Sequence, residues 1–263
     1  MKGKLKIVGI VVGALFLIGM IAIAIIYREP KVAVLSYHNI AKKEEIKKDD
    51  PWCVTLECFE KEMKYLHDAG YKTLTMQEFY EWKTGKREVP FRSVLITFDD
   101  GLLSNAEYAM PILKKYGFNA TIFCIGKEVE KSTAEKWNGD CSLYMKKSKI
   151  EEYKKEYPNI EFYSHSYNMH YENAVNSLTK EQMREGIKKY EELFGKTDVI
   201  AYPFGKYNDK VIEVLKEKGY KMGFTLADNK KATREESNWT INRINVSQDK
   251  PLYKFALRLL LPY

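Results

Sequence analysis

The sequence predicts an α/β protein, a (β/α) barrel of about seven strands that follows one N-terminal transmembrane helix. Short apolar runs typical of buried strands alternate with amphipathic segments from residue 32 onward, which favours a parallel sheet with helices outside it. The number of these repeats favours closure into a barrel. One longer apolar run, residues 7–26, precedes them and has the length of about 20 residues that a helix needs to cross a bilayer.

The N-terminal segment carries a charge signal beside its apolar run. Three lysines precede the run, which predicts that residues 1–6 stay in the cytoplasm. Residues 7–27 are then a single-pass signal anchor in the cell membrane, and residues 28–263 form one extracellular domain. A cleaved signal peptide is the alternative, because residues 22–24, Ala-Ile-Ala, resemble a cleavage site. The run is longer than a typical signal core, which favours the uncleaved anchor.

Length and charge restrict the class of protein further. Residues 28–263 have the length of one α/β barrel, and no low-complexity linker divides them. The net charge of +7 includes the three lysines before the apolar run, and the Lys/Glu-rich segments have the pattern of solvated helix faces. We therefore expect a monomer with no nucleic-acid partner.

The four cysteines, Cys53, Cys58, Cys124 and Cys141, are spaced irregularly. No Cys-x-x-Cys occurs, so the spacing indicates neither a zinc ribbon nor a thioredoxin-like motif. Cys124 lies in an apolar run and is expected to be a small buried residue of a strand. A disulfide between Cys53 and Cys58 stays open, since an extracellular compartment permits one.

Strand and helix signals follow one another in order. Capping boxes begin two of the helices, at Thr75 and Thr179, and Gly70, Gly117, Gly195 and Gly219 mark helix ends. The predicted strands are residues 32–38, 71–74, 94–98, 120–125, 160–163, 198–202, 221–226 and 239–246. The predicted helices are residues 59–66, 75–82, 108–116, 149–157, 179–194, 211–217 and 251–261.

Two adjacent carboxylates, Asp99 and Asp100, follow the predicted strand at residues 94–98. Such neighbours repel each other unless a cation or solvent separates them, so the pair indicates a metal site. Side chains alternate between the faces of a strand, and both carboxylates reach one pocket only where the chain leaves the sheet, which Gly101 permits. We assign Asp100 as a metal ligand and Asp99 as the general base. A solvated Asp-Gly turn is the alternative.

Two histidines follow another predicted strand, at His165 and His170. Their spacing of five suits neither a helix face nor a strand face, so they converge only if residues 166–169 form a loop. Together with Asp100 they make a three-ligand site for a divalent metal, for which Zn²⁺ is favoured and Co²⁺ or Ni²⁺ are alternatives. Two unrelated polar histidines are the other interpretation, and His67 is expected to be structural.

A metal of this kind activates water for hydrolysis, and Asp99 is then placed to take the proton of the water. A general acid is still required, and His38, at the exit of the first predicted strand, is the candidate. The alternative is a core histidine beside Tyr37. Backbone N–H groups in the bend at residues 203–205, Pro-Phe-Gly, can supply an oxyanion contact, or the bend is only a turn.

Three motifs resemble the polysaccharide deacetylase family, the NodB-homology domain of carbohydrate esterase family 4. They are Thr-Phe-Asp-Asp-Gly at 97–101, Ser-His-Ser at 164–166 with His170, and Tyr-Pro-Phe-Gly at 202–205. The resemblance implies a distorted (β/α) barrel that removes acetyl groups from N-acetylated sugars. It implies Asp99 as base and Asp100, His165 and His170 as metal ligands. It also implies that the backbone at Phe204, with Tyr202 and Pro203, forms the oxyanion and substrate contact.

The chain departs from the commonest members of that family. Those members space their histidines four apart and carry an arginine shortly before the motif proline, where this chain has Ala201, and their late Asp-Trp and Leu-x-His motifs are missing here. The wider spacing and the early Tyr37-His38 resemble the poly-N-acetylglucosamine deacetylase branch. Arg243 is a candidate replacement for the missing arginine beside Asp99, or a surface arginine on an edge strand.

The sequence therefore predicts an anchored, extracellular, metal-dependent N-deacetylase. Its expected partner is a polysaccharide that contains N-acetylglucosamine, either poly-N-acetylglucosamine or peptidoglycan glycan. One alternative is an O-acetyl esterase that acts on a wall or plant polysaccharide. Another is a non-catalytic glycan-binding module in which tyrosines such as Tyr163 and Tyr167 stack on sugar rings.

Overall fold

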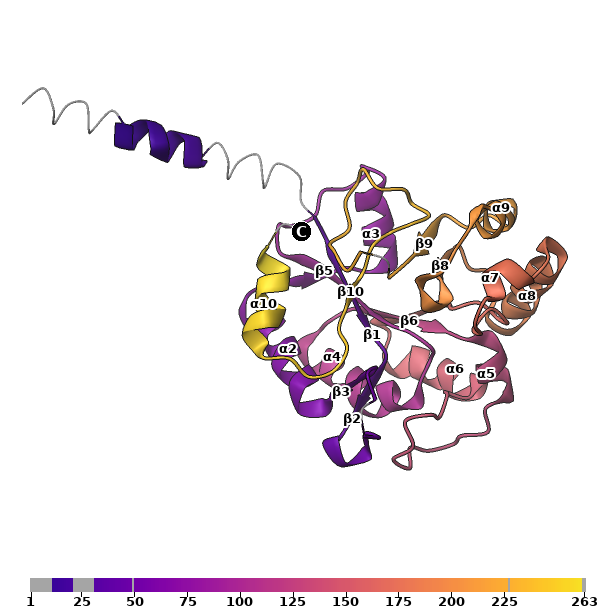
Figure 1. The fold of residues 1–263 in the computed structure, drawn as a ribbon. Helices are drawn as coiled ribbons and strands as arrows, with labels where there is room; N and C mark the ends of the chain where they lie inside the picture. The colour runs from indigo at the N-terminus through magenta and orange to yellow at the C-terminus, as the bar shows by residue number, and fades with distance from the viewer. Residues whose placement is uncertain (1–10, 21–30, 49, 227, 262–263) are drawn as a thin grey trace, which may run out of the picture.

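The computed structural model describes residues 11–20, 31–48, 50–226 and 228–261. Within them, eight strands form one sheet whose ladders are all parallel. The strands lie in the order β10-β1-β5-β6-β7-β8-β9, and β4 pairs with the start of β5. Helices surround this sheet (Figure 1), so the predicted parallel α/β architecture is confirmed.

The elements have the following bounds. The large sheet contains β1 (Ala33–Tyr37), β4 (Lys72–Thr73), β5 (Ser93–Phe98), β6 (Ala120–Cys124), β7 (Ile160–Ser164), β8 (Val199–Ala201), β9 (Met222–Phe224) and β10 (Ile244–Asn245). A small parallel sheet pairs β2 (Asn39–Ala41) with β3 (Cys53–Thr55). The α-helices are α2 (Leu56–Asp68), α3 (Met76–Lys83), α4 (Met110–Tyr116), α5 (Gly126–Lys131), α6 (Lys147–Glu156), α7 (Ala174–Ser177), α8 (Lys180–Phe194), α9 (Asp209–Glu217) and α10 (Leu252–Leu260). Short 3₁₀ segments are η1 (Lys43–Glu45) and η3 (Pro203–Gly205), and η2 (Asn105–Ala109) is a π-helical turn.

The two ends of the large sheet meet at one point. Ile241 forms an isolated parallel bridge with Phe224 of β9, and the Thr225 N–H donates to the Ile241 carbonyl at 2.9 Å. The sheet is thus a curved half-barrel whose open side is spanned by a single bridge within the described residues.

The predicted last strand, residues 239–246, is wrong in length. Only Ile244–Asn245 forms β10 and pairs with β1. The Glu236 carboxylate accepts hydrogen bonds from the backbone N–H and the side-chain amide of Asn242, at 3.3 Å and 2.6 Å. These side-chain bonds hold the segment before β10 in a turn, because they compete with the ladder for the backbone.

Side chains of β5 alternate between two apolar layers. Val94, Ile96 and Phe98 pack in the cluster with α2 and α4, whereas Leu95 packs in a separate cluster with residues of α3 and β9. Both faces of β5 are therefore buried, which explains its nearly unbroken apolar sequence. We call the side on which Leu95 lies the inner face of the sheet. By alternation, Asp99 belongs to this inner face.

Both predicted capping boxes are present. The Thr75 hydroxyl accepts from the Glu78 N–H at 3.1 Å, and the Glu78 carboxylate accepts from the Thr75 N–H at 3.1 Å. Thr179 and Gln182 exchange the equivalent bonds at 3.2 Å and 2.9 Å. These reciprocal bonds satisfy N–H groups that a helix start leaves unpaired, so α3 and α8 begin where the sequence predicts.

The predicted anchor, residues 7–27, lies largely outside the described residues. Its described part, residues 11–20, is helical and exposed. In the portion of the chain that the structure describes, no helix combines the length and apolarity needed to cross a membrane.

All four cysteines are free. Cys53 packs with Cys141 in a small apolar cluster, whereas the Cys58 thiol lies 3.9 Å from the Glu62 carboxylate. The Cys53–Cys58 disulfide that the sequence leaves open is therefore not present in the structure. Cys124 is buried in β6, as predicted.

Glu62 is a buried carboxyl group on α2, and it makes stability depend on pH. Burial raises its pKa from 4.5 to about 8, and the Tyr37 hydroxyl donates to it at 2.9 Å. Its other charged neighbours are Asp249 and Arg258, which act in opposite directions on this pKa. Between pH 4.5 and 8 the Glu62 carboxyl is therefore protonated in the native state and ionised in the unfolded chain. Stability falls as the pH rises through this range.

Glu62→Gln is expected to stabilise the protein at pH 8 relative to the unsubstituted chain, by on the order of a few kcal/mol, and to have little effect at pH 4.5. Glutamine keeps an acceptor for Tyr37 and cannot ionise. Urea unfolding at both pH values measures the difference. An equal effect of Glu62→Gln at the two pH values would show that the Glu62 carboxyl does not titrate as its burial requires.

Candidate active site

The carboxyl ends of three parallel strands bring predicted site residues to the inner face of the sheet. His38 follows β1, Asp99 follows β5 and His165 follows β7. Along each strand, a residue two or four positions earlier packs on the inner face: Val34, Leu95 and Tyr163, respectively. Because side chains alternate along a strand, the three site residues point to the same side. The parallel registers of β1 with β5 and of β6 with β7 align these ends at one edge.

Asp100 reaches the same cavity because the backbone turns at this residue. Strand alternation alone would send its side chain away from that of Asp99. Its φ of 74° lies in the left-handed region that few non-glycine residues adopt, and Gly101 continues the turn with φ 79°. The predicted exit from the sheet is therefore present, and it begins at the carboxylate itself, one residue before the glycine.

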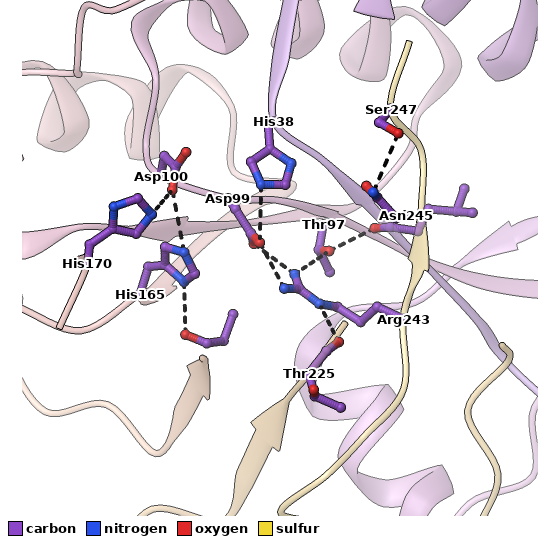
Figure 2. Close-up of polar contacts among 12 residues, drawn as sticks. His38, Thr97, Asp99, Asp100, His165, His170, Thr225, Arg243, Asn245 and Ser247 are labelled. Carbon is purple, nitrogen blue, oxygen red and sulfur yellow. Dashed lines mark hydrogen bonds and ion pairs between the residues drawn. The ribbon is translucent and has the colours of Figure 1, made fainter. Parts of the chain in front are cut away.

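Asp100 and the two histidines converge (Figure 2). Asp100 Oδ1 lies 3.4 Å from His165 Nε2 and 3.3 Å from His170 Nε2. Residues 166–169 form the predicted loop, in which Ser166 has φ 63° and its hydroxyl accepts from the Met169 N–H at 3.0 Å. Donor atoms of the three residues all lie within 4.8 Å of one another. One carboxylate oxygen and two imidazole nitrogens facing a common point fit a divalent metal with open coordination positions.

A backbone contact fixes the orientation of His165. Its Nδ1 lies 2.8 Å from the Ala201 carbonyl and must donate there, because a carbonyl only accepts. The lone pair of a neutral ring is then on Nε2, toward Asp100, as in histidines that ligate metals. Burial lowers the pKa of His165, which favours this neutral form. Burial alone would also lower the pKa of His170, but its hydrogen bond to Asp100 and the negative charges of Asp100 and Asp99 together raise it.

Asp99 has a different partner, Arg243. The guanidinium donates two hydrogen bonds to the carboxylate, at 2.7 Å and 2.8 Å, and both side chains are almost fully buried. Burial alone would raise the pKa of Asp99, but the charge and hydrogen bonds of Arg243, together with the nearby imidazoles of His165 and His38, hold that pKa well below its usual value. Arg243 is held in turn by the Thr225 carbonyl and the Thr97 hydroxyl, each at 3.3 Å. It is thus a buried partner of Asp99 and not a surface arginine.

His38 lies above this ion pair. Its Nε2 is 3.9 Å from Asp99 Oδ2, and its side chain is 12% exposed. The imidazole packs against Trp52, with ring centroids 4.6 Å apart. Its neighbour Tyr37 instead faces α2, where it bonds Glu62. His38 is therefore not a core histidine, and it faces the same cavity as Asp99.

Phe204 lies at the cavity with strained backbone. Its φ is 57°, and its ring packs on the imidazole of His170 with centroids 4.6 Å apart. Left-handed backbone at a bulky residue costs on the order of 1–3 kcal/mol, which is typical of functional positions. Tyr202, by contrast, packs on the outer face in the cluster with Val211 and Val214, and neither it nor Pro203 lines the cavity.

The cavity is an open cleft of about 250 Å³. Besides the predicted residues, several side chains that sequence reasoning missed line it. These are Asn39, Asp50, Trp52, Leu102, Cys141, Ser142, Tyr144 and Leu226. Trp52 is 42% exposed, and a lone tryptophan in a polar segment before β3 is the signal that could have identified it. Nothing in the sequence pattern marks the others.

The cavity contains an ionised buried carboxylate, a three-donor metal site and an adjacent imidazole. These are the groups that a metal-assisted hydrolase uses. The polysaccharide deacetylase family model matches residues 86–223. The chain belongs to this family and is a hydrolase, a polysaccharide deacetylase. The match spans β5 to β9, the part of the chain that contains Asp99, Asp100 and both candidate histidine ligands.

Relatives support the same assignment. The chain is 34% identical over 224 residues to YxkH of Bacillus subtilis, covering 82% of this chain and 72% of that protein. It is 32% identical over 246 residues to the poly-beta-1,6-N-acetyl-D-glucosamine N-deacetylase of Staphylococcus epidermidis, covering 85% of this chain and 81% of the relative.

A solved structure shares the fold. The deacetylase PplD of Streptococcus pyogenes superimposes with a TM-score of 0.74 at 23% identity, covering 88% of this chain and 99% of PplD.

Proposed function

We propose that this protein is a metal-dependent N-deacetylase that acts on an N-acetylglucosamine polysaccharide outside the cell. The observation on which the proposal rests is that the two neighbouring carboxylates have different partners. Asp99 is bound by Arg243, whereas Asp100 faces two imidazoles. One carboxylate therefore stays ionised and free to accept a proton, and the other is a metal ligand, as amide hydrolysis requires.

Asp100, His165 and His170 would hold the metal. When bound, a divalent metal polarises the acetyl carbonyl and lowers the pKa of its water. Mixed carboxylate and imidazole donors suit Zn²⁺, with Co²⁺ or Ni²⁺ as alternatives. The contact of His165 with Ala201 and the packing of His170 on Phe204 hold both rings in place before any ion arrives.

Asp99 and His38 each carry out one of the two proton transfers. Asp99 accepts a proton from the attacking water, since the Arg243 charge keeps it deprotonated. When the carbon–nitrogen bond of the acetamide breaks, the departing nitrogen needs a proton to leave as an amine. His38 supplies it, because its imidazole lines the same cleft and lies above Asp99, apart from the metal-binding residues (Figure 2).

The backbone at Phe204 is the candidate oxyanion contact. Its left-handed conformation turns the chain between β8 and α9 toward the cleft, and Phe204 lines that cleft. An N–H group fixed at the cavity stabilises the negative charge that develops on the acetyl oxygen.

Poly-β-1,6-linked N-acetylglucosamine is the substrate we favour, and peptidoglycan glycan is second. The relatives with that named activity align over 81% of their length, which supports the choice. Residues 7–27, as a membrane anchor, would hold the domain at residues 28–263 outside the cell, where such polymers occur. Acetate release by the full chain from this polymer, with and without chelator, tests the proposal.

Arg243→Met is expected to move the acidic limb that Asp99 sets in the kcat/KM profile from below pH 4 into the measured range above pH 4. The substitution removes the charge that lowers the Asp99 pKa and leaves burial, which raises it, so the base is protonated at a higher pH. Arg243→Lys keeps the charge and should move the limb less. Acetate release measured across pH 4 to 9 gives both profiles. An unmoved limb in Arg243→Met would contradict the role of Asp99 as base.

A further inference from the structure

The C-terminal helix α10 leaves a row of apolar side chains exposed, by 39% to 61%. The row consists of Leu252, Tyr253, Leu257 and Leu260. With about 100° between successive residues, these four fall within one arc of about 140°. Phe255 and Leu259 are the buried residues of the helix and hold it against the domain. Packing within the domain thus covers only part of the apolar surface of α10.

Basic residues accompany this row. Lys254 and Arg258 lie on the flank of α10, Lys250 comes just before it, and no acidic residue occurs from 250 to 263. Arg258 donates to the Asn245 carbonyl at 3.0 Å and stays partly exposed. A helix with an apolar row and a basic flank has the pattern of helices that lie in a membrane interface.

The end of α10 lies beside the point where the chain enters the domain. Lys231 Nζ donates to the Leu259 carbonyl at 2.6 Å. The next residue, Ala232, exchanges backbone hydrogen bonds with Val32 at 3.0 Å and 2.8 Å. Figure 1 shows the yellow helix α10 beside the start of β1. Any surface that holds the residues before Lys31 is therefore close to α10.

The connection to the proposed anchor is short. Residues 28–31 separate the predicted span, residues 7–27, from Val32, which pairs with Ala232 just before β1. Four residues reach at most about 14 Å even when fully extended. With the anchor in a bilayer, the start of β1 and the end of α10 must lie within a short distance of the lipid surface. Such tethering makes contact of α10 with the lipid effectively intramolecular.

We propose that the exposed row of α10 docks on the surface of the bilayer that holds the anchor. The apolar side chains enter the headgroup region, and Lys254 and Arg258 face anionic lipid phosphates. The inference rests on the anchor in the proposed function and is independent of the deacetylation chemistry. Because the strands run parallel, the cleft at their carboxyl ends then opens away from the membrane, toward a polymer outside.

The test places a fluorophore that is sensitive to polarity on the full chain, at Leu257→Cys. The matched control is Lys188→Cys, whose native side chain is 65% exposed. Its helix, α8, lies on the other side of the molecule from α10 (Figure 1). The unsubstituted chain measures labelling of native cysteines. Each protein is reconstituted in phosphatidylcholine vesicles that contain one quarter phosphatidylglycerol, with or without nitroxide-labelled lipid, and vesicle flotation reports whether the anchor inserts.

The expected result is emission at shorter wavelength and several-fold stronger nitroxide quenching at position 257 than at 188, in protein that floats with the vesicles. Equal quenching at both positions in floating protein would overturn the docking of α10 and leave the anchor intact. Protein that does not float overturns both. A shift to shorter wavelength without nitroxide quenching also overturns the proposal, since residues 1–30 or a second copy would then cover α10. Acetate release from a soluble oligomer, measured on the same samples, reports separately on the deacetylase.

Discussion

Asp99→Asn is expected to lower kcat/KM for acetate release by about 10²- to 10⁴-fold, the usual contribution of a general base. Asparagine keeps the size of the side chain and one acceptor for Arg243, but it cannot take a proton from water. The metal-binding residues are separate from this ion pair, so bound metal per chain should not change. Acetate release and elemental analysis of the same preparation measure the two quantities.

Asp68→Asn is the matched control, because the Asp68 carboxylate is 54% exposed and pairs with Lys64 at the end of α2. It should leave activity unchanged. Thermal unfolding of Asp99→Asn must accompany the assay, since Arg243 loses a charged partner in a fully buried position and the fold loses stability. A folded Asp99→Asn protein that keeps more than a tenth of the activity would contradict the assignment of Asp99 as base.

His165→Ala is expected to have the second large effect, loss of most bound metal and of acetate release by at least about 100-fold. Alanine removes one of three donors, and the Ala201 carbonyl loses its donor at the same time. The chain offers a matched control in His67→Ala, because His67 is a half-exposed residue on α2 whose contacts are with Asp68 and Tyr116, outside the cleft.

Zinc content, measured after dialysis against buffer with trace metal, should be close to one ion per chain in His67→Ala and well below that in His165→Ala. High concentrations of added Zn²⁺ should restore His165→Ala only in part. Equal zinc content in the two variants would show that Asp100, His165 and His170 are not the metal site, whatever the effect on activity.

Much of the site was predictable because strand alternation and strand ends are local properties. Asp99 and His165 each end an apolar strand, and parallel strands must bring their carboxyl ends to one edge. The five-residue spacing of His165 and His170 also predicted a loop, which the structure contains.

Other features depend on contacts between distant segments and were not predictable. Arg243 lies 144 residues from Asp99, and its two hydrogen bonds follow from closure of the sheet at Ile241. The left-handed φ of Asp100 is set by the surrounding fold, since most residues avoid that region. Trp52 reaches His38 only because β3 pairs with β2.

The prediction for Tyr202 shows that the residues of one family motif need not all reach the site. It belongs to the same tetrapeptide as Phe204, but alternation along β8 points it outward with Ile200 into the cluster that α8 and α9 cover. The last predicted strand failed for a related reason. Its apolar pattern suited a strand, and the Glu236–Asn242 hydrogen bonds hold it in a turn.

The most direct test is acetate release by the full chain from poly-β-1,6-linked N-acetylglucosamine oligomers, before and after metal removal by chelator. We expect release with Zn²⁺, loss of release after chelation, recovery when Zn²⁺, Co²⁺ or Ni²⁺ is restored, and slower release from O-acetylated xylan. Binding of the oligomers without acetate release at any metal concentration would contradict the proposed function and favour a glycan-binding module. Release that survives complete metal removal would contradict the assigned roles of Asp100, His165 and His170.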